Sequence, residues 1–223
     1  MSAPLVLSFD LDDTLWPIAP VMLAAEDALW SWLQAQHPQV MREHSAATVR
    51  DLRAQVALEY PDRSHDMTFL RHCVIMKMFG KDQAAQRHAD AAFEIFYAER
   101  NRVRLYDDAH AALLRLRRRY RLFALSNGNA DLERCGIGEL FDGHITAIAA
   151  GAAKPDERIF RHLLETAGVE ATQVLHIGDD PRADVHGAMA AGMQAIWLNR
   201  DARPWPEELG PPPRTISTLA EIV

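Results

Sequence analysis

The chain has 223 residues, of which 48% are hydrophobic, and it carries a formal net charge of -7. This length and apolar content suffice for a packed core, so we expect a globular protein of one large domain or two small ones. The acidic balance argues against a nucleic-acid-binding protein, because neutralising phosphates requires clustered Lys and Arg. No apolar run reaches the roughly 18 residues that span a bilayer, and the two cysteines form no CxxC pair. We therefore expect a cytoplasmic protein that binds neither membranes nor nucleic acid.

The first expected element is a strand at residues 5–9, which ends in the acidic stretch SFDLDDTLW. Beyond residue 20 only helix-length amphipathic patterns occur, at 21–36, 42–58, 67–79 and 83–101. The interval from Asp10 to Ser126 exceeds one βαβ unit of roughly 30 residues by about 80 residues. We interpret residues 17–102 as an inserted all-helical domain, for which a lid is the natural role.

Strand and helix patterns alternate after this insert. Strands are expected at 122–125, 145–149, 174–177 and 195–198, and helices at 108–119, 156–167 and 181–191. A proline-rich stretch at 203–214 predicts a stiff loop before a last strand or helix, with a polyproline ligand as the alternative. Alternation of this kind is typical of an α/β fold with a mostly parallel sheet and helices on both faces. Residues 1–16 and 103–223 are expected to form that core.

Two carboxylates, Asp10 and Asp12, directly follow the first strand. On extended backbone, residues two apart face the same way at about 6 to 7 Å, so the two side chains are expected to converge. Mg²⁺ is the candidate to relieve their repulsion, because it prefers oxygen ligands and is usually held by one or two carboxylates with substrate phosphate. An acidic turn or helix cap is the alternative. Asp13, pointing the other way, is expected to be such a turn or cap residue.

Three further polar stretches follow expected strands, at the edge where an α/β sheet binds its ligands. The first, Ser126-Asn127-Gly128, offers a hydroxyl, an amide and a flexible backbone to a phosphate, or is an ordinary loop. In the second, Lys154 precedes a proline. The chain has only three lysines, which favours a site for a compact ammonium group over a surface charge.

The third polar stretch is GDDPRAD, residues 178–184. Asp179 lies nearest the strand and is the better metal candidate. Asp180 precedes a proline and can serve as a helix N-cap. Asp184 falls in the first turn of the helix that follows.

Together these stretches resemble the four motifs of the haloacid dehalogenase-like superfamily. DLDDT is similar to its first motif (DxDxT), SNG to its second, KP to its third and GDDPRAD to its fourth, in the family's order and spacing. The resemblance covers almost the whole chain, including the helical insert, which is similar to the family's type 1 cap. It implies a Rossmann-like core with catalytic carboxylates at the switch point of the sheet.

The resemblance implies roles for the acidic residues. Asp10 would be the nucleophile that forms an aspartyl-phosphate, and Asp12 would be the general acid for the leaving group and then the base for water. Mg²⁺ would be held by the Asp10 carboxylate, the Asp12 backbone carbonyl and Asp179. The chemistry needs Asp10 ionised and Asp12 protonated at the start.

The resemblance also implies a phosphate site. Ser126, the backbone amide of Asn127 and Lys154 would bind the equatorial oxygens, where transition-state charge accumulates. Asp184 would orient Lys154 rather than contact the metal.

The expected function is therefore Mg²⁺-dependent hydrolysis of a small-molecule phosphate ester. A phosphomutase and a dehalogenase-type enzyme are the alternatives, although the dehalogenase branch usually has tyrosine in place of Asp12. The phosphonatase branch uses a cap lysine, but Lys77 and Lys81 are better explained as charges near a helix end. A catalytically idle phosphate-binding protein is the alternative from another class, and the intact acidic set argues against it.

The substrate prediction rests on the start of the insert. The segment 12–33 resembles a bacterial branch that dephosphorylates flavin mononucleotide and the ribityl-aminouracil phosphate of riboflavin synthesis. Trp16 would then stack on a substrate ring, or it packs the hinge into the insert.

Overall fold

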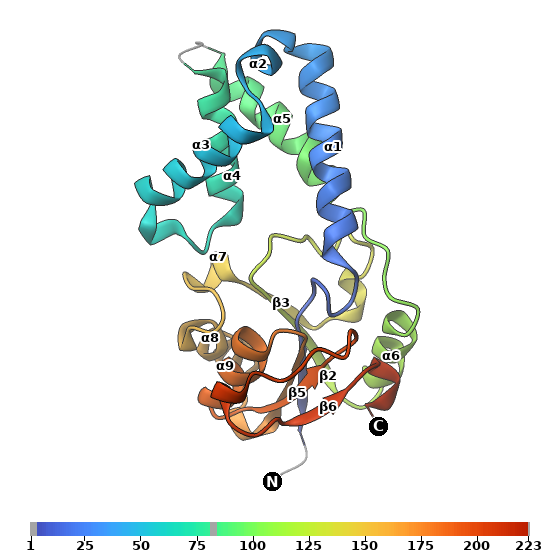
Figure 1. Ribbon diagram of the computed structural model, residues 1–223. Helices are drawn as coiled ribbons and strands as arrows, with labels where there is room; N and C mark the ends of the chain where they lie inside the picture. Colours follow the sequence, from blue (N-terminus) through green and yellow to red (C-terminus); the bar gives the residue numbers. More distant parts are fainter. Residues whose placement is uncertain (1–3, 81–83, 223) are drawn as a thin grey trace. The chain divides into compact units, whose positions relative to one another are not determined.

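The computed structural model describes residues 4–80 and 84–222. The chain divides into two compact units, one made of Met1–Ile18 and Arg104–Val223 and the other of Ala19–Val103. Figure 1 shows the strands in the first unit and α2 to α5 in the second. No helix within the described residues is both long and apolar enough to cross a lipid bilayer.

The first unit is built on a six-stranded sheet in the order β3-β2-β1-β4-β5-β6, and every pair of neighbours is parallel. This confirms the predicted α/β fold. The strands are β1 Val6–Phe9, β2 Arg121–Ser126, β3 Gly143–Thr146, β4 Val174–Gly178, β5 Gln194–Leu198 and β6 Arg214–Ile216.

The strand order places β1 in the middle of the sheet. Its last residue, Phe9, lies beside Ala124 of β2 and Ile177 of β4. After β1, the chain adds β2 and β3 on one side of β1 and then β4, β5 and β6 on the other side. The strand order therefore reverses at β1. Ligands of open α/β sheets bind at such a switch point, beyond the carboxyl ends of the strands.

Helices cover both faces of this sheet (Figure 1). They are α6 Ala109–Leu116, α7 Ala147–Ala150, α8 Glu157–Ala167 and α9 Gly187–Ala190, the last preceded by a π-helical turn at Pro181–His186. Helix α8 begins where the Asp156 carboxylate accepts the N–H of Arg158, and it ends at Gly168 in the left-handed conformation. Its apolar side joins Val6, Phe123 and their neighbours in the core of the sheet.

Two predicted boundaries in this unit are wrong. The strand expected at 145–149 ends at Thr146, because the Thr146 hydroxyl accepts the N–H of Ala149 and starts α7. The helix expected at 181–191 is a π-helical turn followed by the short α9.

Short 3-10 turns also occur along the chain, at Pro61–Arg63, Gly138–Leu140, Ala171–Gln173, Glu207–Leu209 and Leu219–Glu221.

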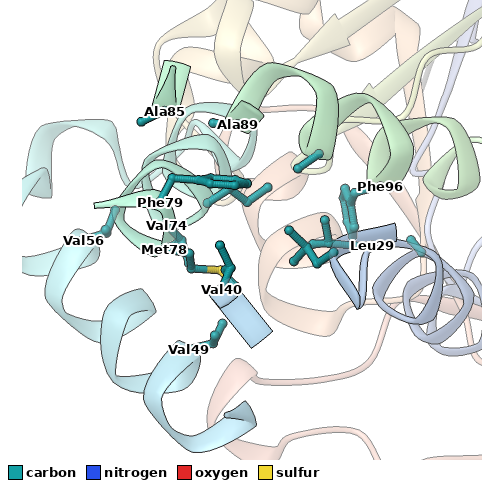
Figure 2. Close-up of a cluster of buried hydrophobic side chains, with 14 residues drawn as sticks. Leu29, Val40, Val49, Val56, Val74, Met78, Phe79, Ala85, Ala89 and Phe96 are labelled. Atoms are coloured by element: carbon teal, nitrogen blue, oxygen red, sulfur yellow. The ribbon is translucent and has the colours of Figure 1, made fainter. Parts of the chain in front are cut away.

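The insert is helical, and no strand occurs among its described residues. Its helices are α1 Ile18–Gln36, α2 Pro38–Glu43, α3 Ala46–Glu59, α4 Met67–Phe79 and α5 Ala85–Arg100. The helix expected at 42–58 is instead split, because His44 is extended and Ser45 starts α3 with a capping box. The helix expected at 83–101 begins partly outside the described residues. Figure 2 shows the apolar core of the insert, in which Leu29 and Phe96 take part.

Candidate active site

Asp10 lies one residue beyond β1, at the reversal point of the sheet. Its backbone N–H donates to the carbonyl of Ile177 at 2.9 Å, which continues the pairing of β1 with β4. Only 7% of Asp10 is exposed. Its carboxylate Oδ1 accepts a hydrogen bond from Lys154 Nζ at 2.6 Å.

A turn begins directly after Asp12, which itself forms a β-bridge with Trp16. The amides of Thr14 and Leu15 both donate to the carbonyl of Leu11. Asp13 has a φ of 59°, in the left-handed region. Within the described part of the chain, the carboxylates that lie within 4.8 Å of one another around Asp10 are those of Asp179 and Asp184.

The turn gives Asp12 and Asp13 separate partners. Asp12 Oδ1 accepts the indole N–H of Trp16 at 2.8 Å. Asp13 Oδ1 accepts the N–H of Ile18, the first residue of α1, at 2.9 Å. Asp13 is therefore the cap residue that the sequence predicted, and it satisfies one of the amides left open at a helix start.

Lys154 is the central cation of the site, with 2% of its side chain exposed. Its ammonium group donates to Asp10 Oδ1 at 2.6 Å, Asp184 Oδ1 at 2.6 Å and the carbonyl of Leu125 at 2.7 Å. An ammonium group has three donors, and each has a partner here. Burial opposes the charge, but Asp10 and Asp184 raise the pKa of Lys154, so it stays protonated.

The loop after β2 fixes the backbone of Lys154. Asn127 Oδ1 accepts the Lys154 N–H at 2.7 Å, and Asn127 Nδ2 donates to the Lys154 carbonyl at 3.0 Å. The Asn127 side chain is thus used to clamp the lysine, a task the sequence did not suggest. Ser126, at the end of β2, accepts the N–H of Gly128 at 2.9 Å and is 1% exposed.

Asp184 lies against Lys154. Its Oδ1 is 2.6 Å from Lys154 Nζ and its Oδ2 accepts the N–H of Asp180 at 2.9 Å. Asp180 itself caps the turn that follows, because its Oδ1 accepts the N–H groups of Arg182 and Ala183. These bonds give Asp180 the N-cap role and turn Asp184 toward the lysine.

Two buried residues that sequence reasoning missed extend this network. Nε2 of His176 is 3.2 Å from Asp184 Oδ1, and Nδ1 of His176 is 2.8 Å from the hydroxyl of Ser8. Burial lowers the pKa of His176 against the opposing effect of Asp184, which favours the neutral ring. A neutral ring that donates to Asp184 from Nε2 accepts the Ser8 hydroxyl at Nδ1.

The carboxylates of Asp10, Asp179 and Asp184 form an acidic cluster, with one oxygen of each within 4.8 Å of the others. Burial raises the pKa of Asp10 well above its ordinary value, although Lys154 opposes the shift. Burial, reinforced by Asp184, raises the pKa of Asp179 to about 6. Burial would also raise the pKa of Asp184, but Lys154 and His176 hold it below its ordinary value.

Arg203, from the proline-rich loop, is a further residue that the sequence did not indicate. Its Nη2 donates to Asp179 Oδ2 at 2.9 Å and to the Asp179 carbonyl at 2.7 Å. The same carbonyl accepts the indole N–H of Trp197 at 2.9 Å. The backbone of Asp179 is therefore held from two sides at the end of β4.

The donor set fits a hard divalent cation. Three clustered carboxylates and one ammonium group leave an excess of two negative charges when all are ionised. A buried excess of charge is unfavourable unless it is compensated. The pKa values of Asp10 and Asp179 are raised because burial disfavours their charged forms. Oxygen donors are the ligands that Mg²⁺ prefers. The oxygens of Asp184 already accept three hydrogen bonds, so Asp10 and Asp179 are the better-placed ligands.

Comparisons with known proteins find phosphatases among the relatives of this chain. The chain is 33% identical over 196 residues, 86% of its length and 82% of the relative's, to 5-amino-6-(5-phospho-D-ribitylamino)uracil phosphatase YigB of Escherichia coli. It is 37% identical over 144 residues, 62% of its length and 57% of the relative's, to the phosphoserine phosphatase of Thermus thermophilus.

Solved structures give the same fold. A structure described as 2-haloacid dehalogenase from Pseudomonas syringae matches with a TM-score of 0.92 and 33% identity, covering 97% of this chain and 95% of the other. The hydrolase YfnB of Bacillus subtilis, described as bound to magnesium, matches with a TM-score of 0.68 and 19% identity over 99% of this chain and 97% of its own. The second likeness concerns the fold alone.

The family assignment rests on a match to most of the chain. The family model described as haloacid dehalogenase-like hydrolase matches residues 5–192, which include every motif of the site. The predicted resemblance and the prediction of a hydrolase are confirmed. This chain belongs to the haloacid dehalogenase-like hydrolase family.

Proposed function

We propose that this protein is a Mg²⁺-dependent phosphatase that hydrolyses a small phosphomonoester through an aspartyl-phosphate on Asp10. The observation that carries the proposal is the buried contact of Asp10 with Lys154 beside Asp179, with the carboxyl group of Asp12 two residues away. A nucleophilic carboxylate, a fixed ammonium and a second carboxyl group are the parts that two-step phosphoryl transfer needs. In this reading, residues 1–16 and 103–223 form the catalytic core and residues 17–102 the cap.

In the first step Asp10 attacks phosphorus, and the bond from phosphorus to the leaving oxygen breaks. The positive charge of Lys154, together with the Ser126 hydroxyl and the backbone N–H of Asn127, stabilises the charge on the equatorial oxygens. Asp12 gives its proton to the departing alkoxide and becomes a carboxylate. The products of this step are the free alcohol and an acyl phosphate on Asp10.

In the second step Asp12 acts as the base. It takes a proton from a water molecule, whose oxygen attacks phosphorus and releases the Asp10 carboxylate and inorganic phosphate. Asp12 is thereby protonated again for the next turnover. Asp184 keeps Lys154 in place throughout, through the bond at 2.6 Å.

The Asp10 and Asp179 carboxylates, with the backbone carbonyl of Asp12, would hold Mg²⁺. When bound, the ion offsets the excess negative charge of the site and so allows Asp10 to be ionised despite its burial. Arg203, which contacts Asp179 Oδ2, leaves the other oxygen of that carboxylate for this purpose.

We further propose flavin mononucleotide or a ribityl-aminouracil phosphate as the substrate. Support comes from the motif segment 12–33 and from the Escherichia coli relative, whose name specifies a ribitylaminouracil phosphate. Trp16 is fully buried at 0% exposure, so it packs the hinge into the insert and does not stack on a substrate ring.

A dehalogenase is the second candidate, because the Pseudomonas syringae structure carries that description. It would form an ester between carbon and Asp10 and would need no general acid. The carboxyl group at position 12, where the dehalogenase branch usually has tyrosine, favours the phosphatase.

Turnover of p-nitrophenyl phosphate, measured with Mg²⁺ and with a chelator, tests the proposal directly. We expect release of inorganic phosphate that the chelator abolishes and added Mg²⁺ restores. A panel of phosphorylated metabolites that includes flavin mononucleotide, assayed beside 2-chloropropionate, then separates the candidates. Chloride release without phosphate release would identify a dehalogenase. Transfer of the phosphoryl group without net phosphate release would identify a phosphomutase, and phosphate binding without turnover an idle binding protein.

A further inference from the structure

The loop between β1 and α1 contains a side-chain contact that the family motif does not specify. The indole N–H of Trp16 donates to Asp12 Oδ1 at 2.8 Å. We propose that Trp16 is a positioning residue, which fixes the orientation of the Asp12 carboxyl group for proton transfer to the leaving group. This inference rests on the general-acid role of Asp12 in the proposed function.

The backbone brings the two side chains together. The amides of Thr14 and Leu15 donate to the Leu11 carbonyl at 3.2 and 2.7 Å, and the amide of Asp13 donates to the Trp16 carbonyl at 2.7 Å. Asp12 and Trp16 also form an isolated β-bridge. This turn returns the chain onto itself, so the position of Trp16 relative to Asp12 is set by the main chain.

The donor is held rigidly. Trp16 is 0% exposed, and the residues before it are anchored elsewhere in the same unit. The Leu15 carbonyl accepts the N–H of Tyr106 at 2.9 Å, and the Thr14 carbonyl accepts Arg200 Nη2 at 3.0 Å. A buried indole N–H needs an acceptor, and Asp12 Oδ1 supplies it.

The value of this contact depends on the leaving group. An alkoxide is a strong base, so its departure needs the proton that Asp12 delivers, whereas p-nitrophenolate leaves without one. A residue that only orients Asp12 therefore matters for alkyl phosphates and hardly matters for p-nitrophenyl phosphate. A residue that merely supports the fold would affect both substrates alike.

Trp16→Phe keeps an aromatic ring, although a smaller one, and removes the indole N–H, and Trp205→Phe is the matched control. Trp205 donates its indole N–H to the Gly210 carbonyl at 2.8 Å and not to Asp12. We compare kcat/KM for p-nitrophenyl phosphate and for the alkyl phosphate that the wild type hydrolyses fastest. Trp16→Phe is expected to lower the alkyl value by about 10- to 100-fold, part of the roughly 10²- to 10⁴-fold that general acids supply. Its value for p-nitrophenyl phosphate should fall by less than about threefold, and Trp205→Phe should change neither.

Equal losses on both substrates, or no loss on either, would overturn the inference. Asp12→Asn separates this failure from failure of the proposed function. If Asp12→Asn shows the leaving-group dependence and Trp16→Phe does not, the acid is confirmed and the positioning role is rejected. A wild type without turnover of either substrate would reject the proposed function.

A second measurement needs no turnover and no Trp16 variant. The indole N–H signals of the wild type and of Asp12→Ala are compared by NMR. We expect one buried indole signal to shift and to exchange faster with solvent in Asp12→Ala, while the Trp205 signal stays unchanged. An unchanged set of indole signals would contradict the contact itself.

Discussion

Replacing Lys154 by methionine removes a buried charge while keeping a side chain of similar length. All three ammonium donors of Lys154 are used, at 2.6, 2.6 and 2.7 Å from their acceptors. Lys154→Met would leave Asp10 and Asp184 facing each other in a site with 7% and 1% exposure. Breaking a buried ion pair in this way costs about 3–5 kcal/mol. For a chain of this size, that lowers Tm by about 6–20 °C.

The loss of stability in Lys154→Met should depend on pH. Lys154 holds the pKa of Asp184 below its ordinary value, so this stabilisation is present above the unfolded pKa of about 3.9 and is lost as the pH falls below it. In Lys154→Met the two carboxylates have lost their cation and take up protons more readily. The difference in Tm between wild type and variant is therefore expected to narrow as the pH is lowered from 8 toward 5.

The assay is thermal unfolding followed by calorimetry, with Lys77→Met as the matched control. Lys77 pairs with Glu59 at 3.0 Å with 30% of its side chain exposed, so its loss should cost less than about 1 kcal/mol. The double variant Lys154→Met, Asp184→Asn should be more stable than Lys154→Met alone, because one stranded charge is removed. A Lys154→Met protein as stable as Lys77→Met, or a double variant less stable than the single one, would refute the charge-compensation argument.

Two further substitutions test other parts of the structure. A Cβ at Gly178 would lie 2.3 Å from Cγ of Asp184, so Gly178→Ala should displace that carboxylate and abolish phosphatase turnover. Gly138→Ala is its control, because the added Cβ meets only a flexible glutamate side chain; similar activity of the two variants would argue against a strict position for Asp184. Burial lowers the pKa of His144, so the unfolded chain takes up that proton first and stability falls as the pH drops below about 6.5. His144→Leu should flatten the decrease of Tm between pH 7 and 5, and an unchanged slope would show that this histidine does not contribute.

Much of the site could be predicted because parallel strands bring their carboxyl ends to one edge. Asp10, Lys154, Asp179 and Asp184 each follow or lie close to such an end, and the structure brings their side chains together. The alternation of apolar runs identified β1, β2, β4 and β5 within one or two residues. These features depend on local patterns and on a topology that has few alternatives.

The turn that follows Asp12 could not be predicted from strand geometry. In this turn Asp13 has a φ of 59°, in the left-handed region. A glycine at this position would have suggested such a conformation, whereas an aspartate adopts it too rarely for the sequence to predict it. The contact of Trp16 with Asp12 follows from that turn.

The remaining partners come from segments distant in sequence. Ser8 and His176 meet because they are register partners on β1 and β4. The apolar pattern of one strand does not predict which residue of the neighbouring strand lies beside it. Arg203 comes from a loop without periodicity, so no signal connected it with Asp179. The role of Asn127 depends on the placement of the Lys154 backbone, which only the folded loops define.

The most direct test of the account is to identify the covalent intermediate. Enzyme mixed with p-nitrophenyl phosphate and Mg²⁺ is quenched in acid within the first turnover, digested and analysed by mass spectrometry. We predict one added phosphoryl group on the peptide that contains Asp10, and none in Asp10→Asn. A phosphoryl group on another residue, or phosphate release by Asp10→Asn at the wild-type rate, would contradict the central claim.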